Sequence, residues 1–329
     1  MLVCLYEDRP QQVAGLKLLI LSLRRYCPSW PVRVRFPAMS DRLRIWLASF
    51  PNVTAIDQGL CISGSYNIKP SVLLDGLSAS DECIWLDTDI LVNGPLTGFR
   101  QIPPEVLVVA QDPWEYSLGS THRCATWGLP AGRELDGPLN SAVVRVSSRH
   151  RELLSTWQQL VSKESYLREQ QKPAGDRNHH LLGDQDALSA ILASENFKHV
   201  DVRRLLHSSE ILQHHGAGAY GLRQRWQNVQ TGLPPLLHAM GSTKPWRAPN
   251  HPRVARQFRQ YYERTYLELS PYVHVARQYR SSLDEDTSWM DIQTVAGRLG
   301  SIAALGHPCL KGAVQATMHR AVNRLRNGR

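Results

Sequence analysis

The segment Cys83-Ile84-Trp85-Leu86-Asp87-Thr88-Asp89 places two carboxylates directly after a short apolar run. Four consecutive apolar residues are typical of a strand that is buried in the middle of a sheet. In α/β proteins, functional groups lie in the loops at the carboxyl ends of such strands. Two carboxylates one residue apart can share Mn²⁺ or Mg²⁺ and leave ligand positions for a diphosphate. The segment therefore predicts a buried strand followed by a candidate metal site.

The Asp-x-Asp pattern alone is weakly specific, because it occurs three times in this chain. The other two copies are Asp184-Gln185-Asp186 and Asp284-Glu285-Asp286. Each copy also has a structural explanation. The first could be a solvated strand exit, and the second could be a helix start, where acids are favourably placed. The third could be a surface run of charge. We favour the first copy as the metal pair because it follows a predicted strand.

Short β-rich runs alternate with helical patterns on both sides of this segment. The expected strands are residues 3–6, 32–36, 53–56, 83–86, 106–110 and 142–146. The expected helices are residues 13–25, 42–50, 68–77, 151–169 and 184–194. This alternation predicts an α/β fold with a central, mainly parallel sheet flanked by helices.

Composition describes a globular chain. Of its 329 residues, 42% are hydrophobic and 20% are charged, which excludes a disordered or collagen-like protein. The six cysteines form no Cys-x-x-Cys pair, so neither a zinc ribbon nor a dithiol redox centre is expected, and a reducing compartment is favoured. The apolar stretch 13–23 contains Lys17 and is too short to cross a bilayer. We therefore expect a cytoplasmic protein without a signal peptide or membrane anchor.

The net charge of +9 is concentrated near the end of the chain. Residues 292–329 contain no acidic side chain and supply six of the nine charges, from Arg298, Lys311, Arg320, Arg324, Arg326 and Arg329. The remainder of the chain is only about three charges basic, so we expect no nucleic-acid partner. Apolar residues at helical spacing predict a basic amphipathic helix in this segment. Two interpretations stay open: the helix contacts the inner face of an anionic membrane or a lipid-linked acceptor, or it packs on the protein with a solvated basic face.

A second informative segment begins at His238, which follows the apolar run Pro235-Leu236-Leu237. A strand there would present His238 as a neutral imidazole ligand. Gly241 allows the backbone to approach a phosphate closely, and Lys244 can neutralise a diphosphate. A single histidine is more often a core or surface residue than a ligand. Beside a pair of aspartates it becomes a candidate third ligand.

These segments, in this order, resemble the retaining glycosyltransferases of the GT-A fold, family 8, which include bacterial lipopolysaccharide galactosyl- and glucosyltransferases and glycogenin. The most specific part is the His-x-x-Gly-x-x-Lys-Pro-Trp signature at residues 238–246, matched at every fixed position. The Asp87-Thr88-Asp89 motif, Asn140-Ser141 and Gly183-Asp184-Gln185-Asp186 follow in the family's order. The resemblance covers residues 1 to about 265.

The resemblance implies a Mn²⁺ or Mg²⁺ ion that is held by Asp87, Asp89 and His238 and bridges the diphosphate of a UDP-sugar. It also implies that Gly241 and Lys244 contact the phosphates. By the same likeness, the residues that face the donor or the acceptor are Tyr6, near the uracil, with Lys69, Asp112, Asn140, Asp184 and Gln185. Asp184 or Gln185 would act at the sugar, where the resemblance leaves open a transient nucleophile or a stabiliser of positive charge.

The chain departs from the family pattern at two places. Ala142 replaces the commoner glycine after Asn140-Ser141, and the first loop, residues 6–10, lacks the usual small and acidic run. The departures concern the sugar pocket and the recognition of the base.

The expected function is a metal-dependent retaining glycosyltransferase that moves a hexose from a UDP-sugar to a glycan or glycolipid acceptor, in cell-surface polysaccharide biosynthesis. We expect a GT-A catalytic domain over residues 1–265 and a helical, basic C-terminal extension over residues 266–329. One alternative is a metal-dependent nucleotidyltransferase, although Glu7-Asp8-Arg9-Pro10 stands where its glycine-rich loop should be. The other alternative is a non-catalytic sugar-nucleotide or membrane-binding protein with the same fold.

Overall fold

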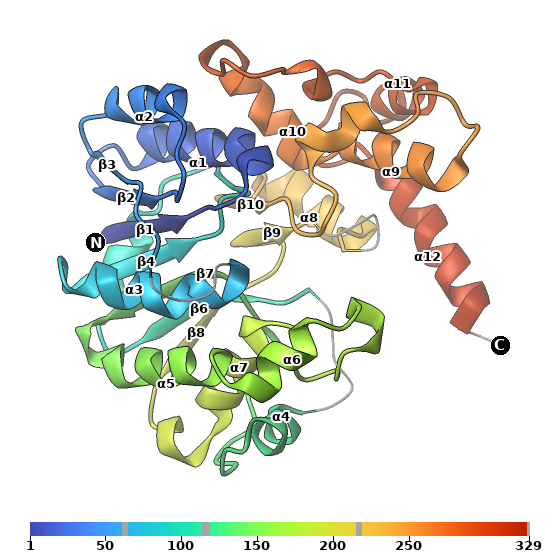
Figure 1. Ribbon diagram of the computed structural model, residues 1–329. Helices are drawn as coiled ribbons and strands as arrows, with labels where there is room; N and C mark the ends of the chain where they lie inside the picture. The colour runs from blue at the N-terminus through green and yellow to red at the C-terminus, as the bar shows by residue number, and fades with distance from the viewer. Residues whose placement is uncertain (61–64, 114–118, 215–218, 328–329) are drawn as a thin grey trace. The chain divides into compact units, whose positions relative to one another are not determined.

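The computed structural model describes residues 1–60, 65–113, 119–214 and 219–327 (Figure 1). The chain forms two compact units, and each is built from separate stretches of the sequence. The first unit comprises Met1–Pro10, Pro28–Thr88 and Thr97–Leu205. The second unit comprises Gln11–Cys27, Asp89–Leu96 and Leu206–Arg329.

A seven-stranded sheet forms the centre of the first unit, in the order β3-β2-β1-β4-β7-β6-β8. Its strands are β1 (Leu2–Tyr6), β2 (Val32–Arg35), β3 (Val53–Ile56), β4 (Glu82–Leu86), β6 (Leu107–Gln111), β7 (Leu139–Ser147) and β8 (Val202–Leu205). Strand β7 runs antiparallel to both of its neighbours, and the other pairs are parallel. The predicted α/β fold with a mainly parallel sheet is confirmed.

Helices of the first unit cover this sheet. They are α2 (Asp41–Ala48), α3 (Lys69–Leu77), α4 (Ser120–Trp127), α5 (Arg151–Val161), α6 (Glu164–Gln170) and α7 (Asp184–Ala193). Helix α3 lies against β1 and β4, α7 lies against β7, and α5 packs against both helices (Figure 1). Side chains of α3, α5 and α7 meet those of the strands in a single apolar core, in which Trp157 is fully buried. This core fixes the ends of the strands from which the candidate site is built.

The single helix expected over residues 151–169 is wrong, because the structure divides it into α5 and α6. Lys163 has an extended backbone with φ −61° and ψ 133°, which ends the helical run. The division lets Tyr166 enter the core of the first unit and donate a hydrogen bond to Asn67 at 2.9 Å.

The second unit contains a three-stranded sheet in the order β5-β10-β9. Its strands are β5 (Ile90–Val92), β9 (Ile211–Gln213) and β10 (Leu236–His238), and its helices are α1 (Val13–Tyr26), α8 (Leu222–Thr231), α9 (Phe258–Glu268), α10 (Pro271–Ala276), α11 (Val295–Ala303) and α12 (Ala313–Asn327). The predicted strand before His238 is present as β10. Leu18 of α1, Leu91 of β5 and Leu237 of β10 share one core with α10.

The C-terminal part of the chain belongs to this unit. The predicted basic helix is present as α12, and Tyr272, Val273 and Met290 lie in the same core as Leu18 and Leu91. The boundary expected at residue 265 falls inside α9 and stays a prediction. Among the described residues, none of the helices combines the length and the apolar character that a bilayer crossing requires.

The third Asp-x-Asp copy has a structural role that the sequence did not indicate. Asp284 and Glu285 both form ion pairs with the ammonium of Lys17, which is fully buried in α1. Asp286 accepts hydrogen bonds from the amide and the hydroxyl of Ser288, at 2.8 and 2.9 Å. Asp284 and Asp286 are exposed, as expected for a surface run of charge, and Asp284 also serves with Glu285 as a partner for the buried charge of Lys17.

Candidate metal and donor site

Asp87, Thr88 and Asp89 form the short loop between β4 and β5. The amide of Asp87 donates to the carbonyl of Ala142 in β7 at 2.8 Å, which extends the pairing of β4 with β7. The carbonyl of Asp89 accepts from the amide of Ala239, directly after β10, at 3.0 Å. Backbone hydrogen bonds thus fix both ends of the loop.

Asp89 is surrounded by two nitrogen groups of the second unit. Its Oδ1 lies 3.2 Å from Nε2 of His238, and its Oδ2 pairs with the ammonium of Lys244. Lys244 also donates to the carbonyl of Ala239 at 2.9 Å. Burial alone would raise the pKa of the Asp89 carboxyl, but Lys244 and His238 outweigh burial and hold this pKa well below its usual range. Asp89 is therefore an anion at neutral pH.

Gln213 orients the imidazole of His238. The two residues are register partners in the parallel pair β9 and β10, and Oε1 of Gln213 contacts Nδ1 of His238. An amide oxygen only accepts, so Nδ1 carries a proton, and Nε2 is the ring nitrogen that faces Asp89. Two acceptor atoms 3.2 Å apart repel each other unless a proton or a metal cation lies with them. This chemistry suits a divalent cation.

Asp87 lies at the end of β4 with partners from the first unit. Its Oδ1 accepts from Nε1 of Trp85 at 2.7 Å and lies 3.1 Å from Nζ of Lys69. The side chain of Asp87 is only partly buried, so a carboxylate oxygen is accessible to a further ligand.

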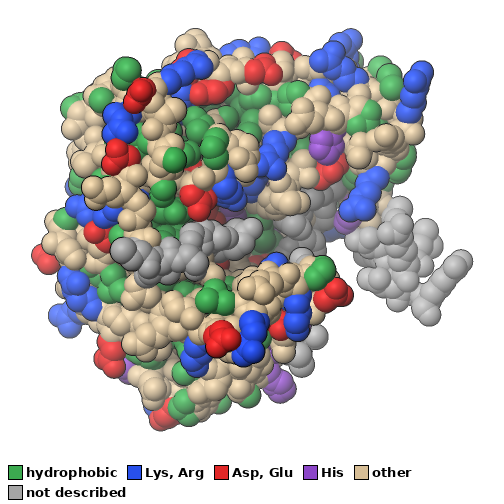
Figure 2. Space-filling view, in the orientation of Figure 1, with side chains coloured by type: hydrophobic (Ala, Val, Ile, Leu, Met, Phe, Trp, Pro, Cys, Tyr) green, Lys and Arg blue, Asp and Glu red, His purple; other side chains and the backbone are tan. Residues whose placement is uncertain are grey.

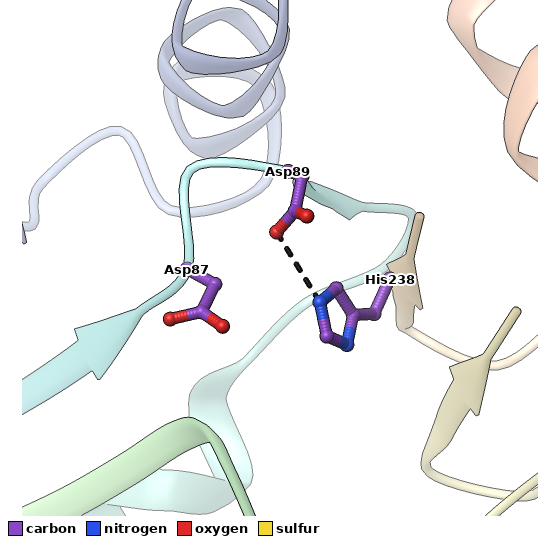
Figure 3. A group of neighbouring side chains, drawn as sticks. All are labelled: Asp87, Asp89 and His238. Atoms are coloured by element: carbon purple, nitrogen blue, oxygen red, sulfur yellow. Dashed lines mark ion pairs between the residues drawn. The ribbon is translucent and has the colours of Figure 1, made fainter. Parts of the chain in front are cut away.

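Asp87, Asp89 and His238 each offer a ligand atom, and these atoms lie within 4.8 Å of one another (Figure 3). Asp87 and Asp89 are held near each other by the single residue between them, and His238 reaches Asp89 from the end of β10. Two carboxylates and one imidazole form a ligand set that suits Mn²⁺ or Mg²⁺. The residues present therefore fit the metal that the sequence predicted.

Lys69 connects Asp87 with Asp184 inside the first unit. Its ammonium donates to Oγ of Ser141 at 2.8 Å and lies 3.5 Å from Oδ2 of Asp184. Ser141 donates in turn to the same oxygen of Asp184 at 2.7 Å. Burial raises the pKa of the Asp184 carboxyl, and Lys69 and Ser141 only partly offset this effect. The first turn of α7 thus carries a buried carboxyl group beside a buried cation.

The predicted residues Asn140, Gln185 and Asp112 form an adjoining chain of hydrogen bonds. Nδ2 of Asn140 donates to Oε1 of Gln185 at 3.1 Å, and Nε2 of Gln185 donates to Oδ2 of Asp112 at 3.2 Å. The register between β6 and β7 shifts between Val109 and Ala110, so that Ala110 lies opposite Asn140. Six residues that were predicted to face donor or metal are therefore brought together at the ends of β4, β6, β7 and α7.

The loop after β10 contains the remaining predicted phosphate contacts. Gly241 has φ +103°, a conformation that side-chain-bearing residues adopt only under strain. This turn directs the chain back, so that Lys244, six residues after the end of β10, pairs with Asp89. Farther along, Nε1 of Trp246 donates to the carbonyl of Gln11 at 3.0 Å. This hydrogen bond fixes the loop to the residues just before α1.

Two further residues support the site, Glu7 and Gln213, and neither was predicted from the sequence. Glu7 is fully buried after β1 and accepts from the hydroxyl of Thr88 at 2.5 Å and from the amide of Arg9 at 3.0 Å. It therefore holds the central residue of the Asp-x-Asp loop. The only sequence signal was an acidic residue at the end of a buried strand, and Gln213 had no signal beyond its position at the end of β9.

Tyr6 occupies the end of β1, as predicted. Its hydroxyl contacts Oδ2 of Asp8 at 3.5 Å, and its ring packs against the core of the first unit. Burial and the charge of Asp8 raise the pKa of Tyr6 to about 12. The hydroxyl is therefore neutral, and the ring offers an apolar face next to the strand end.

Comparisons with solved structures identify the fold. A structure of the galactosyltransferase LgtC with donor and acceptor sugar analogs is similar with a TM-score of 0.51 and 17% identity, over 86% of this chain and 100% of LgtC. An active-site mutant of LgtC gives a TM-score of 0.52 and 17% identity, over 88% of this chain and 98% of that protein. The apo bifunctional glycosyltransferase WbbM gives a TM-score of 0.51 and 13% identity, over 74% of this chain.

This chain covers only 46% of the length of WbbM. Neither models of protein families nor curated protein sequences match the chain. At these identities the similarity establishes architecture, and the architecture is that of the GT-A glycosyltransferases.

Proposed function

We propose that this protein is a metal-dependent, retaining glycosyltransferase of family 8 that moves a hexose from a UDP-sugar to a hydroxyl group of a glycan or glycolipid. The observation that carries the proposal is the group Asp87, Asp89 and His238, with Lys244 paired to Asp89. These groups follow strand ends in a chain with the GT-A fold. We place the reaction in the cytoplasm, in the assembly of a cell-surface polysaccharide.

The charges of the site match the bond that breaks. Cleavage of the bond between the anomeric carbon and the phosphate oxygen leaves negative charge on UDP and positive character on the sugar. A Mn²⁺ or Mg²⁺ ion held by Asp87, Asp89 and His238 would supply Lewis-acid stabilisation of the diphosphate. Lys244 would add a positive charge beside the same phosphates, and Gly241 would let the backbone approach them.

Asp184 and Gln185 are the residues that we assign to the sugar. The carboxylate of Asp184 is oriented by Ser141 and Lys69, and the amide of Gln185 is oriented by Asn140 and Asp112. Fixed partners on both sides leave each group little freedom, which is the requirement for stabilising a developing charge without reorganisation. Asp184 would stabilise the positive sugar, and the acceptor hydroxyl would attack from the face that the phosphate leaves, with its proton passing to an oxygen of the departing phosphate.

The loop after β1 argues against a nucleotidyltransferase. Such an enzyme offers backbone amides of this loop to a phosphate. Here the amides of Asp8 and Arg9 donate to the carboxylate of Glu7, at 3.1 and 3.0 Å. An anionic side chain already occupies the position that a phosphate would need.

Release of UDP from a panel of UDP-hexoses, with and without an acceptor mixture, tests the proposal. We expect turnover of at least one donor with Mn²⁺, loss of turnover with EDTA, and loss of turnover in Asp87→Asn. Asp286→Asn is the matched control, because Asp286 belongs to an Asp-x-Asp copy that caps Ser288. Turnover that survives EDTA and Asp87→Asn would refute the proposal.

A further inference from the structure

An apolar pocket of about 340 Å³ lies among α9, α11 and α12 of the second unit. Its lining includes Phe258, Tyr262, Leu299, Ala303, Val314 and Met318. The volume lies in the range of small-molecule pockets, which is about 300–1,000 Å³. Nothing in the proposed transfer reaction uses this pocket.

The hydroxyl groups of Tyr261, Tyr262 and Thr265 in the lining form hydrogen bonds with the protein itself. The hydroxyl of Tyr262 donates to the carbonyl of Gln315 at 2.7 Å, and the hydroxyl of Tyr261 accepts from the amide of Ala296 at 3.2 Å. Oγ1 of Thr265 donates to the carbonyl of Tyr261 at 2.9 Å. The rings and methyl groups are what these residues present to the pocket, so the pocket suits a hydrocarbon.

Four exposed apolar side chains line the pocket, and four more lie near the lining residues in the sequence. Among the described residues, twelve large hydrophobic side chains are exposed, and eight of them lie between residues 254 and 318. Those eight are Val254, Phe258, Val295, Leu299, Ile302, Leu305, Val314 and Met318. Such a concentration marks an interaction surface, since scattered exposed hydrophobics need no explanation.

The charge of the second unit identifies the kind of partner. This unit contains 19 Lys and Arg against 8 Asp and Glu, whereas the first unit contains 19 against 21. Residues 211–262 and 292–329, which supply most of the pocket wall, contain no acid. The exposed side chains of Arg256, Arg259 and Arg298 flank lining residues in sequence, and basic side chains lie on the surface that α9 and α11 form (Figure 2).

We propose that this pocket receives a hydrocarbon chain of an anionic membrane lipid and so docks the second unit onto a bilayer. The exposed apolar side chains would enter the boundary between headgroups and acyl chains, while the arginines contact anionic headgroups. A polyanion such as nucleic acid would pair with the arginines but would leave the apolar surface in water. An anionic lipid pairs with the arginines and also covers the apolar side chains. The proposal stands apart from the transfer reaction, because it rests on α9, α11 and α12.

Sedimentation of the full chain with vesicles tests the proposal. The vesicles are phosphatidylcholine alone and phosphatidylcholine with one quarter phosphatidylglycerol. We expect binding to the anionic vesicles, weaker binding to the neutral ones, and a loss of about tenfold or more in Leu299→Gln, because burying a leucine contributes at least that factor to an equilibrium constant. Ile45→Gln is the matched control and should bind like the wild type, since Ile45 is 72% exposed in the first unit and Leu299 is 63% exposed.

Met318→Gln repeats the test on a second helix, and circular dichroism verifies that each variant is folded. Equal binding of wild type, Leu299→Gln and Met318→Gln would overturn the proposal, as would the absence of vesicle binding by the wild type. A dimer that forms without lipid and is lost in Leu299→Gln, with no vesicle binding, would assign the surface to a second copy of the chain and would also overturn it.

Discussion

Replacing Asp89 with Asn should affect both stability and metal binding, because the carboxylate pairs with the ammonium of Lys244 and is also a candidate metal ligand. In the structure it pairs with Lys244, and the side chains of Asp89 and Lys244 are only 13% and 9% exposed. Removing one partner of a buried ion pair costs about 3–5 kcal/mol. The remaining exposure places the expected loss in the free energy of unfolding near the lower limit, at about 3 kcal/mol.

The same substitution removes one of the three candidate ligands. Loss of a residue that only supports a ligand weakens metal binding by about 10–100-fold, so loss of a ligand should exceed about 100-fold. Denaturant unfolding measures the first effect and calorimetric titration with Mn²⁺ measures the second. Asp286→Asn should leave Mn²⁺ binding unchanged, since Asp286 caps Ser288.

A double variant separates the loss of stability from the loss of metal binding, because it should reverse the first and not the second. In Asp89→Asn the ammonium of Lys244 is buried without its carboxylate, whereas Asp89→Asn with Lys244→Met removes that cation. The double variant should therefore be more stable than Asp89→Asn alone, and it should still fail to bind Mn²⁺. A wild-type stability for Asp89→Asn, or additive losses in the double variant, would refute the reasoning.

Three further predictions concern other parts of the structure. Gly241→Ala should lower the free energy of unfolding by about 1–2 kcal/mol and weaken UDP binding, because φ is +103° there; thermal unfolding and UDP titration measure this, and an unchanged UDP affinity would contradict it. Glu7→Gln should cost about 2 kcal/mol and reduce turnover, because the buried carboxylate accepts from Thr88; equal stability by denaturant unfolding would count against this role. Burial and the nearby Lys311 and Arg277 lower the pKa of His274 to about 4. As the pH falls, His274 is therefore protonated in the unfolded chain before it is protonated in the folded one. The free energy of unfolding should fall as the pH drops from 6.5 to 4. His274→Gln should reduce that fall in unfolding measurements between pH 7 and 5, and an unaltered fall would contradict the assignment.

The sequence predicted those features that depend on a few neighbouring residues. Strand β4 follows from four consecutive apolar residues, and Asp87 and Asp89 follow from their place after it. The helix break at Lys163 could not be predicted, because the residues on both sides favour a helix and the break depends on the packing of Tyr166.

Contacts between distant segments were also outside the reach of local patterns. Lys17 and Asp284 pair across 267 positions, and nothing near either residue indicates the other. Gln213 supports His238 only because β9 and β10 are parallel neighbours. The basic character of the second unit was underestimated for a similar reason, since two separate stretches, Gln11–Cys27 and Leu206–Arg329, contribute its Lys and Arg residues.

The positions that were assigned by resemblance form a different case. Lys69 and Asn140 have no local pattern that marks them as functional, and Asp184 and Gln185 lie in an Asp-x-Asp copy that a helix start would also explain. The structure places all four in adjoining hydrogen-bond chains. Their contacts are now described, and their roles in transfer stay predictions that substitution must test.

Asp87, Asp89 and His238 are proposed to bind one divalent cation beside a diphosphate. Pulsed electron paramagnetic resonance of Mn²⁺ with UDP measures this directly, because an imidazole ligand gives a nitrogen coupling. We expect one Mn²⁺ per chain with a nitrogen coupling that is lost in His238→Ala. A Mn²⁺ signal without that coupling, or one that is unchanged in His238→Ala, would contradict it.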